Sequence, residues 1–222
     1  RQALSALSEY LQIYTAQRIL YFHSETKGIL LARSDKTNYL MMAKEMKAKK
    51  PAGFRAALYK EHFLELAARN LSGELSLPET NIHRIFTLLE ENAHIARDFP
   101  REYLTSVYNF GIHKLYTREP EKANELAARL REFSESVRLS PGLEYASLQL
   151  HAILQIGVYH LRLQFEPAEK YFEEYIKKVK RFDGLEPNYS REKVIWYVMG
   201  NLSFSTGNYK AAIRYLSRIT SE

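Results

Sequence analysis

The stretch that decides the fold lies near the carboxyl end, where residues 196–216 read WYVMGNLSFSTGNYKAAIRYL. Apolar residues recur in it three or four positions apart on both sides of a Gly-Asn pair, which is typical of two helices joined by a tight turn. Gly200 interrupts the first helix, although a glycine inside a helix costs about 0.5–1 kcal/mol relative to alanine. We expect a close approach of the second helix at Ala212 to compensate for it. Residues 190–206 and 209–220 are therefore predicted to form a helical hairpin.

The pattern around Gly200 recurs twice upstream, around Gly157 and Gly111, at intervals of 43 and 46 residues. Each glycine follows apolar residues one and four positions earlier, and each precedes an alanine eleven or twelve positions later. The first of these hairpins is expected to turn at Glu119 and Pro120. The middle one has no glycine in its turn, which we place at residues 164–166, one residue shorter than the last. One hairpin cannot bury its apolar face alone, so a series of hairpins is expected.

This series resembles the tetratricopeptide repeat, a helical hairpin of about 34 residues, although the units here are longer. The resemblance is closest over residues 190–220, less specific over 101–182 and faint over 1–100. It implies an all-α fold built as a right-handed α-α superhelix of about five antiparallel helical hairpins. It also implies a role as a scaffold in protein-protein interaction.

Proline placement supports the helical interpretation independently of any family. The seven prolines recur every 20 to 27 residues, and proline is tolerated in the first turn of a helix but breaks one elsewhere. The stretch 23–35 is expected to form a short helix or a packed loop. The predicted helices span residues 2–22, 36–49, 52–71, 79–97, 101–117, 121–138, 142–163, 167–182, 190–206 and 209–220.

Composition favours one well-packed helical domain. The chain has 222 residues, 45% of them hydrophobic, which is enough for one continuous core over residues 1–222. We expect atypical hairpins over 1–100 and three tetratricopeptide-like hairpins over 101–222. No run of 18 or more apolar residues occurs, so membrane insertion is not expected. The chain begins inside an expected helix, which suggests a piece of a longer protein, and the absence of cysteine and of a signal segment favours the cytoplasm without fixing the compartment.

The residues that could carry chemistry predict no catalytic, cofactor-binding or metal-binding site. The glycines are scattered singly, and no phosphate-binding loop is present. Glu91 and His94 have the spacing of a di-iron pair, but a second pair is missing. Glu61, His62 and Glu65 lack the second histidine of a zinc helix. We expect both sets on solvated helix faces and a non-enzymatic protein. The alternative, a helical enzyme, requires such side chains to converge in a pocket with shifted pKa values.

The net charge of +6 raises nucleic acid as a possible partner. Both basic clusters lie at predicted helix carboxyl ends, where cations are favoured by the helix dipole whatever the protein binds. We therefore favour solvated helix ends and keep a nucleic-acid-binding or peptide-sensing regulatory domain as the alternative. The clusters are Lys44, Lys47, Lys49 and Lys50, and Lys177, Lys178, Lys180 and Arg181.

The family resemblance also implies a binding groove. In tetratricopeptide-like proteins the first helix of each hairpin lines the concave face, and in the middle unit here the stripe would consist of Leu154, Val158 and Leu161. The stripe is too apolar to grip a terminal carboxylate, so a peptide or helix with an apolar surface is the expected partner. The alternative is that tight superhelical packing, or neighbouring repeats of a longer protein, buries these residues. The expected partner-binding residues are Tyr108, Ile112, Tyr116, Arg162, Tyr197, Asn201 and Phe204.

Overall fold

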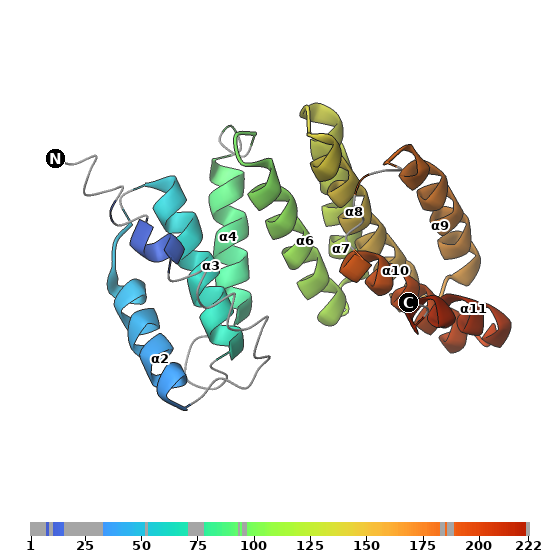
Figure 1. Cartoon of the computed structure of the whole chain (residues 1–222), viewed down its shortest axis with the longest axis horizontal. Coiled ribbons are helices and arrows are strands. Elements are labelled where there is room, and N and C mark those ends of the chain that lie inside the picture. Colours follow the sequence, from blue (N-terminus) through green and yellow to red (C-terminus); the bar gives the residue numbers. More distant parts are fainter. Residues whose placement is uncertain are drawn as a thin grey trace. The chain divides into compact units, whose positions relative to one another are not determined.

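The chain divides into two compact units, Arg1–Ile95 and Ala96–Glu222 (Figure 1). Within the residues that the structure describes there are helices and turns but no strand, which confirms the all-α prediction. The superhelical arrangement and the single domain over 1–222 stay predictions. The structure, a computed structural model, describes residues 8, 11–15, 33–51, 53–70, 78–92, 94, 97–182, 185 and 189–220.

Three helices of the first unit pack around a small core. They are α2 (Arg33–Ala48), α3 (Phe54–Asn70) and α4 (Pro78–Glu91). Of the predicted helix over 2–22, residues 8 and 11–15 are described and helical, and most of the stretch 23–35 lies outside the described residues. The predicted end of the fourth helix at residue 97 is wrong, because α4 ends at Glu91. The buried cluster of this unit comprises Ile13, Tyr39, Ala43, Met46, Ala56, Phe63, Leu64 and Ala67.

The burial of two carboxylates on α3 differs from what the sequence led us to expect. A solvated face was expected for Glu61, His62 and Glu65, but Glu61 and Glu65 are only 8% and 7% exposed because α4 packs against α3. Burial raises the pKa of Glu61, while the positive charges of Arg84 and Lys60 act against the rise. Burial also lowers the pKa of His62 to about 4, so its ring is neutral at pH 7.

Residues Glu91 and His94, by contrast, are exposed as predicted. The two residues do not share one helix, because α4 ends at Glu91 and residue 92 lies in a turn. The sequence spacing alone therefore could not separate the buried carboxylates of α3 from these two exposed residues.

The second unit consists of three helical hairpins in sequence. Each first helix packs against its own second helix, and α8 also packs against both α6 and α10 (Figure 1). A proline occupies the first turn of α6, α7 and α8, which confirms that prolines punctuate the helices here. The helices are α6 (Pro100–Tyr116), α7 (Pro120–Ser136), α8 (Pro141–Leu161), α9 (Phe165–Val179), the 3-10 turn η1 (Lys180–Phe182), α10 (Tyr189–Ser205) and α11 (Tyr209–Thr220).

The corners of the three hairpins have the same backbone geometry. Each contains one residue with positive φ: Arg118 at 56°, Leu163 at 53° and Gly207 at 78°. The N–H of the next residue donates to a carbonyl five positions earlier over 2.8–2.9 Å, which is the Schellman arrangement for ending a helix. The predicted middle turn at residues 164–166 is therefore wrong. The corner lies at Leu163, α9 already begins at Phe165, and the middle turn is no shorter than the other two.

Each second helix keeps the same register after its corner. Ala123, Ala168 and Ala212 follow the positive-φ residue by five positions in all three hairpins, and all three alanines are buried. The corners themselves recur at intervals of 45 and 44 residues. The second unit is therefore helical-repeat-like in its backbone, including the two hairpins whose turns lack glycine.

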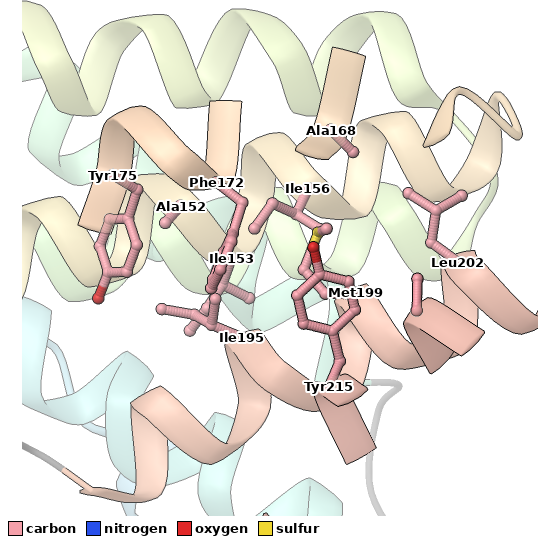
Figure 2. Close-up of a cluster of buried hydrophobic side chains, with 11 residues drawn as sticks. Ala152, Ile153, Ile156, Ala168, Phe172, Tyr175, Ile195, Met199, Leu202 and Tyr215 are labelled. Atoms are coloured by element: carbon pink, nitrogen blue, oxygen red, sulfur yellow. The ribbon is translucent and has the colours of Figure 1, made fainter. Parts of the chain in front are cut away.

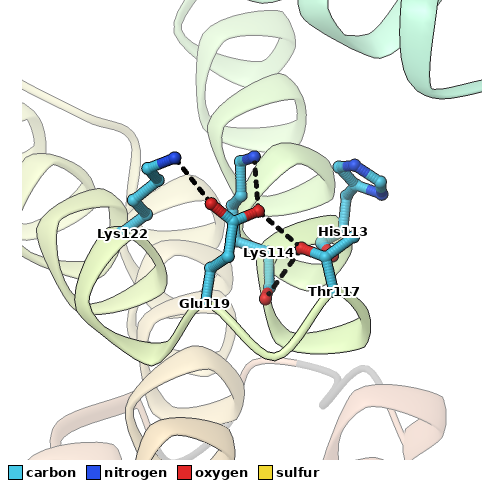
Figure 3. A network of polar contacts seen from close by, with 5 residues as sticks. All are labelled: His113, Lys114, Thr117, Glu119 and Lys122. Atoms are coloured by element: carbon cyan, nitrogen blue, oxygen red, sulfur yellow. Dashed lines mark hydrogen bonds and ion pairs between the residues drawn. The ribbon is translucent and has the colours of Figure 1, made fainter.

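A carboxylate network stabilises the corner between α6 and α7, where no glycine is present. Glu119 accepts hydrogen bonds from Lys114 at 2.9 Å, Thr117 at 2.8 Å and Lys122 at 2.6 Å (Figure 3). The Thr117 hydroxyl also lies 3.2 Å from the carbonyl of His113. The bonds from Lys122, Lys114 and Thr117 lower the pKa of Glu119 to about 2, because they favour its charged form.

The core of the second unit lies where the middle and last hairpins meet (Figure 2). Side chains from four helices converge there, and the first hairpin adds Tyr108 and Ile112 at the edge. Burial of this apolar surface is the main force that holds the two hairpins together. The cluster comprises Ala152, Ile153, Ile156, Ala168, Phe172, Tyr175, Ile195, Met199, Leu202, Ala211 and Tyr215.

Gly111, Gly157 and Gly200 each allow another helix to come close, but the helix that does so differs among them. A Cβ atom on Gly111 would lie 2.6 Å from a methyl carbon of Leu154 in α8. Gly157 of α8 faces Leu115 of α6 just as closely, so these two glycines serve the contact between two first helices.

Gly200 instead serves the contact inside its own hairpin. A Cβ atom there would lie 2.5 Å from the side chain of Leu216 in α11. The close approach of the second helix is therefore confirmed, but Leu216 rather than Ala212 supplies the atoms nearest to Gly200. Ala212 lies one turn earlier on α11 and is buried.

Candidate functional site

The predicted binding residues of α10 lie on an open helix face. Tyr197 and Phe204 are 55% and 62% exposed, and Val194 is 39% exposed. Together with the half-buried Asn201, they follow one another at intervals of three, four and three residues, which places them on one side of the helix. We call these four residues the α10 stripe. Packing among the described residues therefore does not bury the predicted groove residues of this helix, and burial by neighbouring repeats of a longer protein stays a prediction.

The apolar surface continues from α10 onto α11. The ring of Phe204 meets that of Tyr209 edge to face, with 5.6 Å between ring centroids. Tyr209 and Ile213, one turn further along α11, are both exposed. Large apolar side chains that gather on one surface in this way are typical of interaction sites rather than of scattered surface residues.

The equivalent stripe on α8 is closed. Leu154 and Val158 are fully buried, and Leu161 is half-buried. The expectation of an open groove in the middle unit is therefore wrong. The physical reason is the contact with α6, whose Gly111 leaves room for Leu154 to enter the interface.

The predicted residues of α6 divide between core and surface. Tyr108 and Ile112 pack at the edge of the buried cluster, and burial raises the pKa of the Tyr108 hydroxyl. Tyr116, at the end of the helix, is 82% exposed. Arg162, the last predicted residue, forms an ion pair with Glu121 of α7. Since its guanidinium is held by the preceding hairpin, we leave Arg162 out of the candidate site.

A second surface feature lies around Trp196, on the side of α10 away from the stripe. It is a cleft of about 400 Å³ between α9, α10 and α11, with aromatic rings on its floor and basic side chains on its rim. Its lining residues are Phe172, Glu173, Ile176, Lys177, Lys180, Trp196, Arg214, Tyr215 and Arg218. We call it the Trp196 cleft.

The Trp196 cleft could not be found from the sequence. Its cations come from two helices more than 30 residues apart, and the basic cluster of residues 177–181 is divided by the fold. Lys177 and Lys180 face this cleft, whereas Lys178 and Arg181 line a different cavity. Only the packing of α9 against α11 reveals which of these cations act together.

That other cavity, of about 470 Å³, brings a histidine and glutamates together between α7, α8 and α9. His151 Nδ1 lies 2.5 Å from the hydroxyl of Tyr171. Burial lowers the pKa of His151 to about 4, and the charges of Arg131 and Lys178 act in the same direction. An imidazole with this pKa is a weak proton acceptor, far from the neutral value that suits acid-base catalysis.

Among the described residues, no group of three or more His, Asp or Glu side chains is arranged to hold a metal ion. None of the described helices combines the length and apolar character that crossing a membrane requires. Comparison with protein-family models, with curated proteins and with solved structures finds no match to this chain. What the protein binds is therefore inferred from the surfaces of the second unit.

Proposed function

We propose that this chain is a tetratricopeptide-repeat-like interaction module, wound as a superhelix, that binds an amphipathic helix of a partner protein along the α10 stripe. One observation carries the proposal: large apolar side chains stay exposed on a single face of α10. The buried core of the same unit contains eleven residues from four helices, so the exposed side chains are not needed to complete it.

The spacing of the stripe favours a helix as the partner. Apolar residues at alternating intervals of three and four form the seam along which two helices pack. An extended peptide repeats every two residues and matches this spacing poorly. Asn201, in the middle of the seam, adds a polar group that can specify the register of the bound helix.

The chemistry of the stripe favours an apolar partner surface over a nucleic acid. Val194, Tyr197, Asn201 and Phe204 carry no charge, so these four residues themselves offer no cation to a phosphate backbone. Tyrosine and phenylalanine supply large contact areas at a small cost in side-chain entropy. Tyr197 and Phe204 are therefore the expected anchors.

Photo-crosslinking from the stripe tests this proposal. A photoreactive phenylalanine analogue is placed at position 197 of the whole chain, and at Met41 of α2 as a matched exposed control, in native extract. We expect crosslinks from position 197 to peptides whose apolar residues recur every three or four positions. Phe204→Ala should reduce their yield about tenfold, since an anchor residue contributes more than 1 kcal/mol.

The controls separate binding from folding. Phe204 is more than half exposed, so Phe204→Ala should leave the circular dichroism spectrum and the unfolding midpoint nearly unchanged. Equal crosslinking from positions 197 and 41, or crosslinked segments without a helical apolar period, would show that the stripe is not a helix-binding site.

A further inference from the structure

We infer that the Trp196 cleft is a second binding site, which takes an acidic peptide segment through one aromatic or large apolar side chain. It lies on another side of α10 from the stripe, so it does not depend on the function proposed above.

The floor consists of three aromatic rings that hold one another in place. The centroids of Phe172 and Trp196 lie 4.7 Å apart with the rings at 67°, and those of Phe172 and Tyr215 lie 5.5 Å apart at 77°. Phe172 and Tyr215 are buried, whereas Trp196 is half-buried. Rings that hold one another in place and are partly accessible from the cleft offer a preorganised surface for a flat or bulky apolar group.

The rim of the cleft is strongly basic. Lys177 of α9 and Lys180 of η1 line it together with Arg214 and Arg218 of α11, and Glu173 is the one carboxylate among the lining residues. The guanidinium of Arg218 lies 4.8 Å from the centroid of the Trp196 ring.

Arg214 also contacts an aromatic ring, and its guanidinium forms a hydrogen bond with a carboxylate. Its guanidinium lies 4.6 Å from the centroid of Tyr215 and donates to Glu169 over 2.6 Å. Even with the charges of Arg214 and Arg218 set aside, Lys177 and Lys180 outnumber Glu173 among the lining residues. A ligand that complements the cleft is therefore anionic around an apolar centre.

The size of the cleft limits the ligand to one or two side chains. A volume of about 400 Å³ is at the small end of ligand sites in proteins, which span roughly 300–1,000 Å³. This volume accommodates a phenylalanine or tyrosine side chain while neighbouring carboxylates reach the lysines and arginines of the rim. A whole helix face does not fit, which distinguishes this site from the α10 stripe.

The distribution of charge favours a peptide over a nucleic acid. Single-stranded nucleic acid needs a basic track that follows its backbone over several nucleotides. Here Lys178 and Arg181 point away from the cleft, and Arg181 is held by Glu144 at 2.5 Å. The basic cluster of residues 177–181 is thus divided between two cavities and does not form one continuous track.

Trp196 is the only tryptophan of the chain, so its fluorescence reports on the cleft directly. The probe is a synthetic pentapeptide with one phenylalanine between two pairs of glutamates, added to the whole chain at low ionic strength. We expect a saturable change in tryptophan emission that weakens as salt is raised. A peptide with alanine in place of the phenylalanine should bind at least about tenfold more weakly, because it leaves the aromatic floor empty.

Matched charge reversals on α9 and η1 locate the site. Lys177→Glu or Lys180→Glu should weaken binding of the phenylalanine peptide about five- to tenfold, since each places a carboxylate on the rim. Lys178→Glu makes the same charge change on α9 but faces the other cavity, so it should have little effect. Circular dichroism of the three variants checks that each is folded.

Four results would overturn the inference. These are no change in emission with the phenylalanine peptide, equal binding of the alanine peptide, an equal loss of affinity in Lys178→Glu, and tighter binding of a ten-nucleotide oligo-dT than of the peptide. The last result would assign the cleft to nucleic acid instead.

Discussion

The middle and last hairpins of the second unit have the same sequence pattern but use it differently. Both carry a glycine after apolar residues in the first helix, and both turn through the same Schellman corner. Yet Gly157 is in close contact with Leu115 of the neighbouring hairpin, whereas Gly200 is in close contact with Leu216 of its own second helix. The pattern therefore specifies a hairpin with a small residue at a crossing, and the packing decides which helix crosses there.

This difference determines which surface stays open. On α8 the stripe enters the contact with α6, and Leu154 is fully buried. On α10 the corresponding stripe keeps Tyr197 and Phe204 exposed. Equivalent positions in two repeats can thus be core in one and exposed surface in the other.

The largest effect is expected from removing the leucine that faces Gly111 between two hairpins, Leu154, and the leucine that faces Gly200 within one hairpin, Leu216. Leu154→Ala should lower the free energy of unfolding by about 3 kcal/mol, because a fully buried leucine leaves a cavity. Leu216→Ala should cost only about 1 kcal/mol, since Leu216 is half-buried and solvent can reach the site. Denaturation by urea measures both, and equal losses would show that the two contacts are equivalent.

A smaller effect is expected from adding a methyl group at the glycines themselves. Gly111→Ala should cost about 1–2 kcal/mol, because Leu154 is buried and cannot move aside, although alanine gains about 1 kcal/mol in helix propensity. Gly200→Ala should be nearly neutral, since Leu216 can rotate toward solvent. Gly142→Ala, where a Cβ atom meets nothing within 4 Å, is the control that should not destabilise the protein. A larger loss in Gly200→Ala than in Gly111→Ala would contradict the comparison.

The corners should respond to substitution with opposite signs. Gly207→Ala should cost about 1 kcal/mol, because a side chain is strained at a φ of 78°. Leu163→Gly should stabilise the protein by about 0.5 kcal/mol, since it relieves the same strain at 53° and removes an exposed side chain. Thermal unfolding of the two variants checks this, and destabilisation by Leu163→Gly would mean that the two corners are not alike.

The smallest effect should appear only in acid and only at the first corner. The pKa of Glu119 is about 2 in the folded chain, below its usual value of 4.5. The carboxylate therefore makes its full contribution to the free energy of unfolding above pH 4.5, and this contribution is lost as the pH falls toward 2. Glu119→Gln should therefore narrow the difference in stability between pH 6 and pH 3. Gln164 and Asn208 occupy the equivalent positions and cannot titrate, so Gln164→Ala should leave the pH dependence unchanged.

Turn chemistry explains which parts of the fold were predictable. Gly207 marks its corner in the sequence because glycine tolerates positive φ. Arg118 and Leu163 adopt the same conformation at a cost, which nothing in the local sequence announces, and so the middle turn was placed wrongly. The proline at the start of α8 marks its helix correctly, since proline suits the first turn of a helix wherever that helix packs.

The candidate sites were less predictable than the fold. Tyr197 and Phe204 could be chosen from their helix face, but Leu154, on the same face of α8, is core. The Trp196 cleft was missed, because Lys177 and Arg214 are separated by a whole helix in the sequence and meet only when α9 packs against α11.

Local sequence patterns were enough to predict that the described part of this chain is helical, where most of its helices begin and that they pair as hairpins. Those properties arise from apolar periodicity, prolines and glycines within about 20 residues of one another. Three features depend on tertiary packing: which helix contacts each glycine, which stripe remains exposed and which cations line the Trp196 cleft. The rotation of each helix depends on contacts between residues 40 or more positions apart, such as that of Gly111 with Leu154, and local periodicity does not encode such contacts.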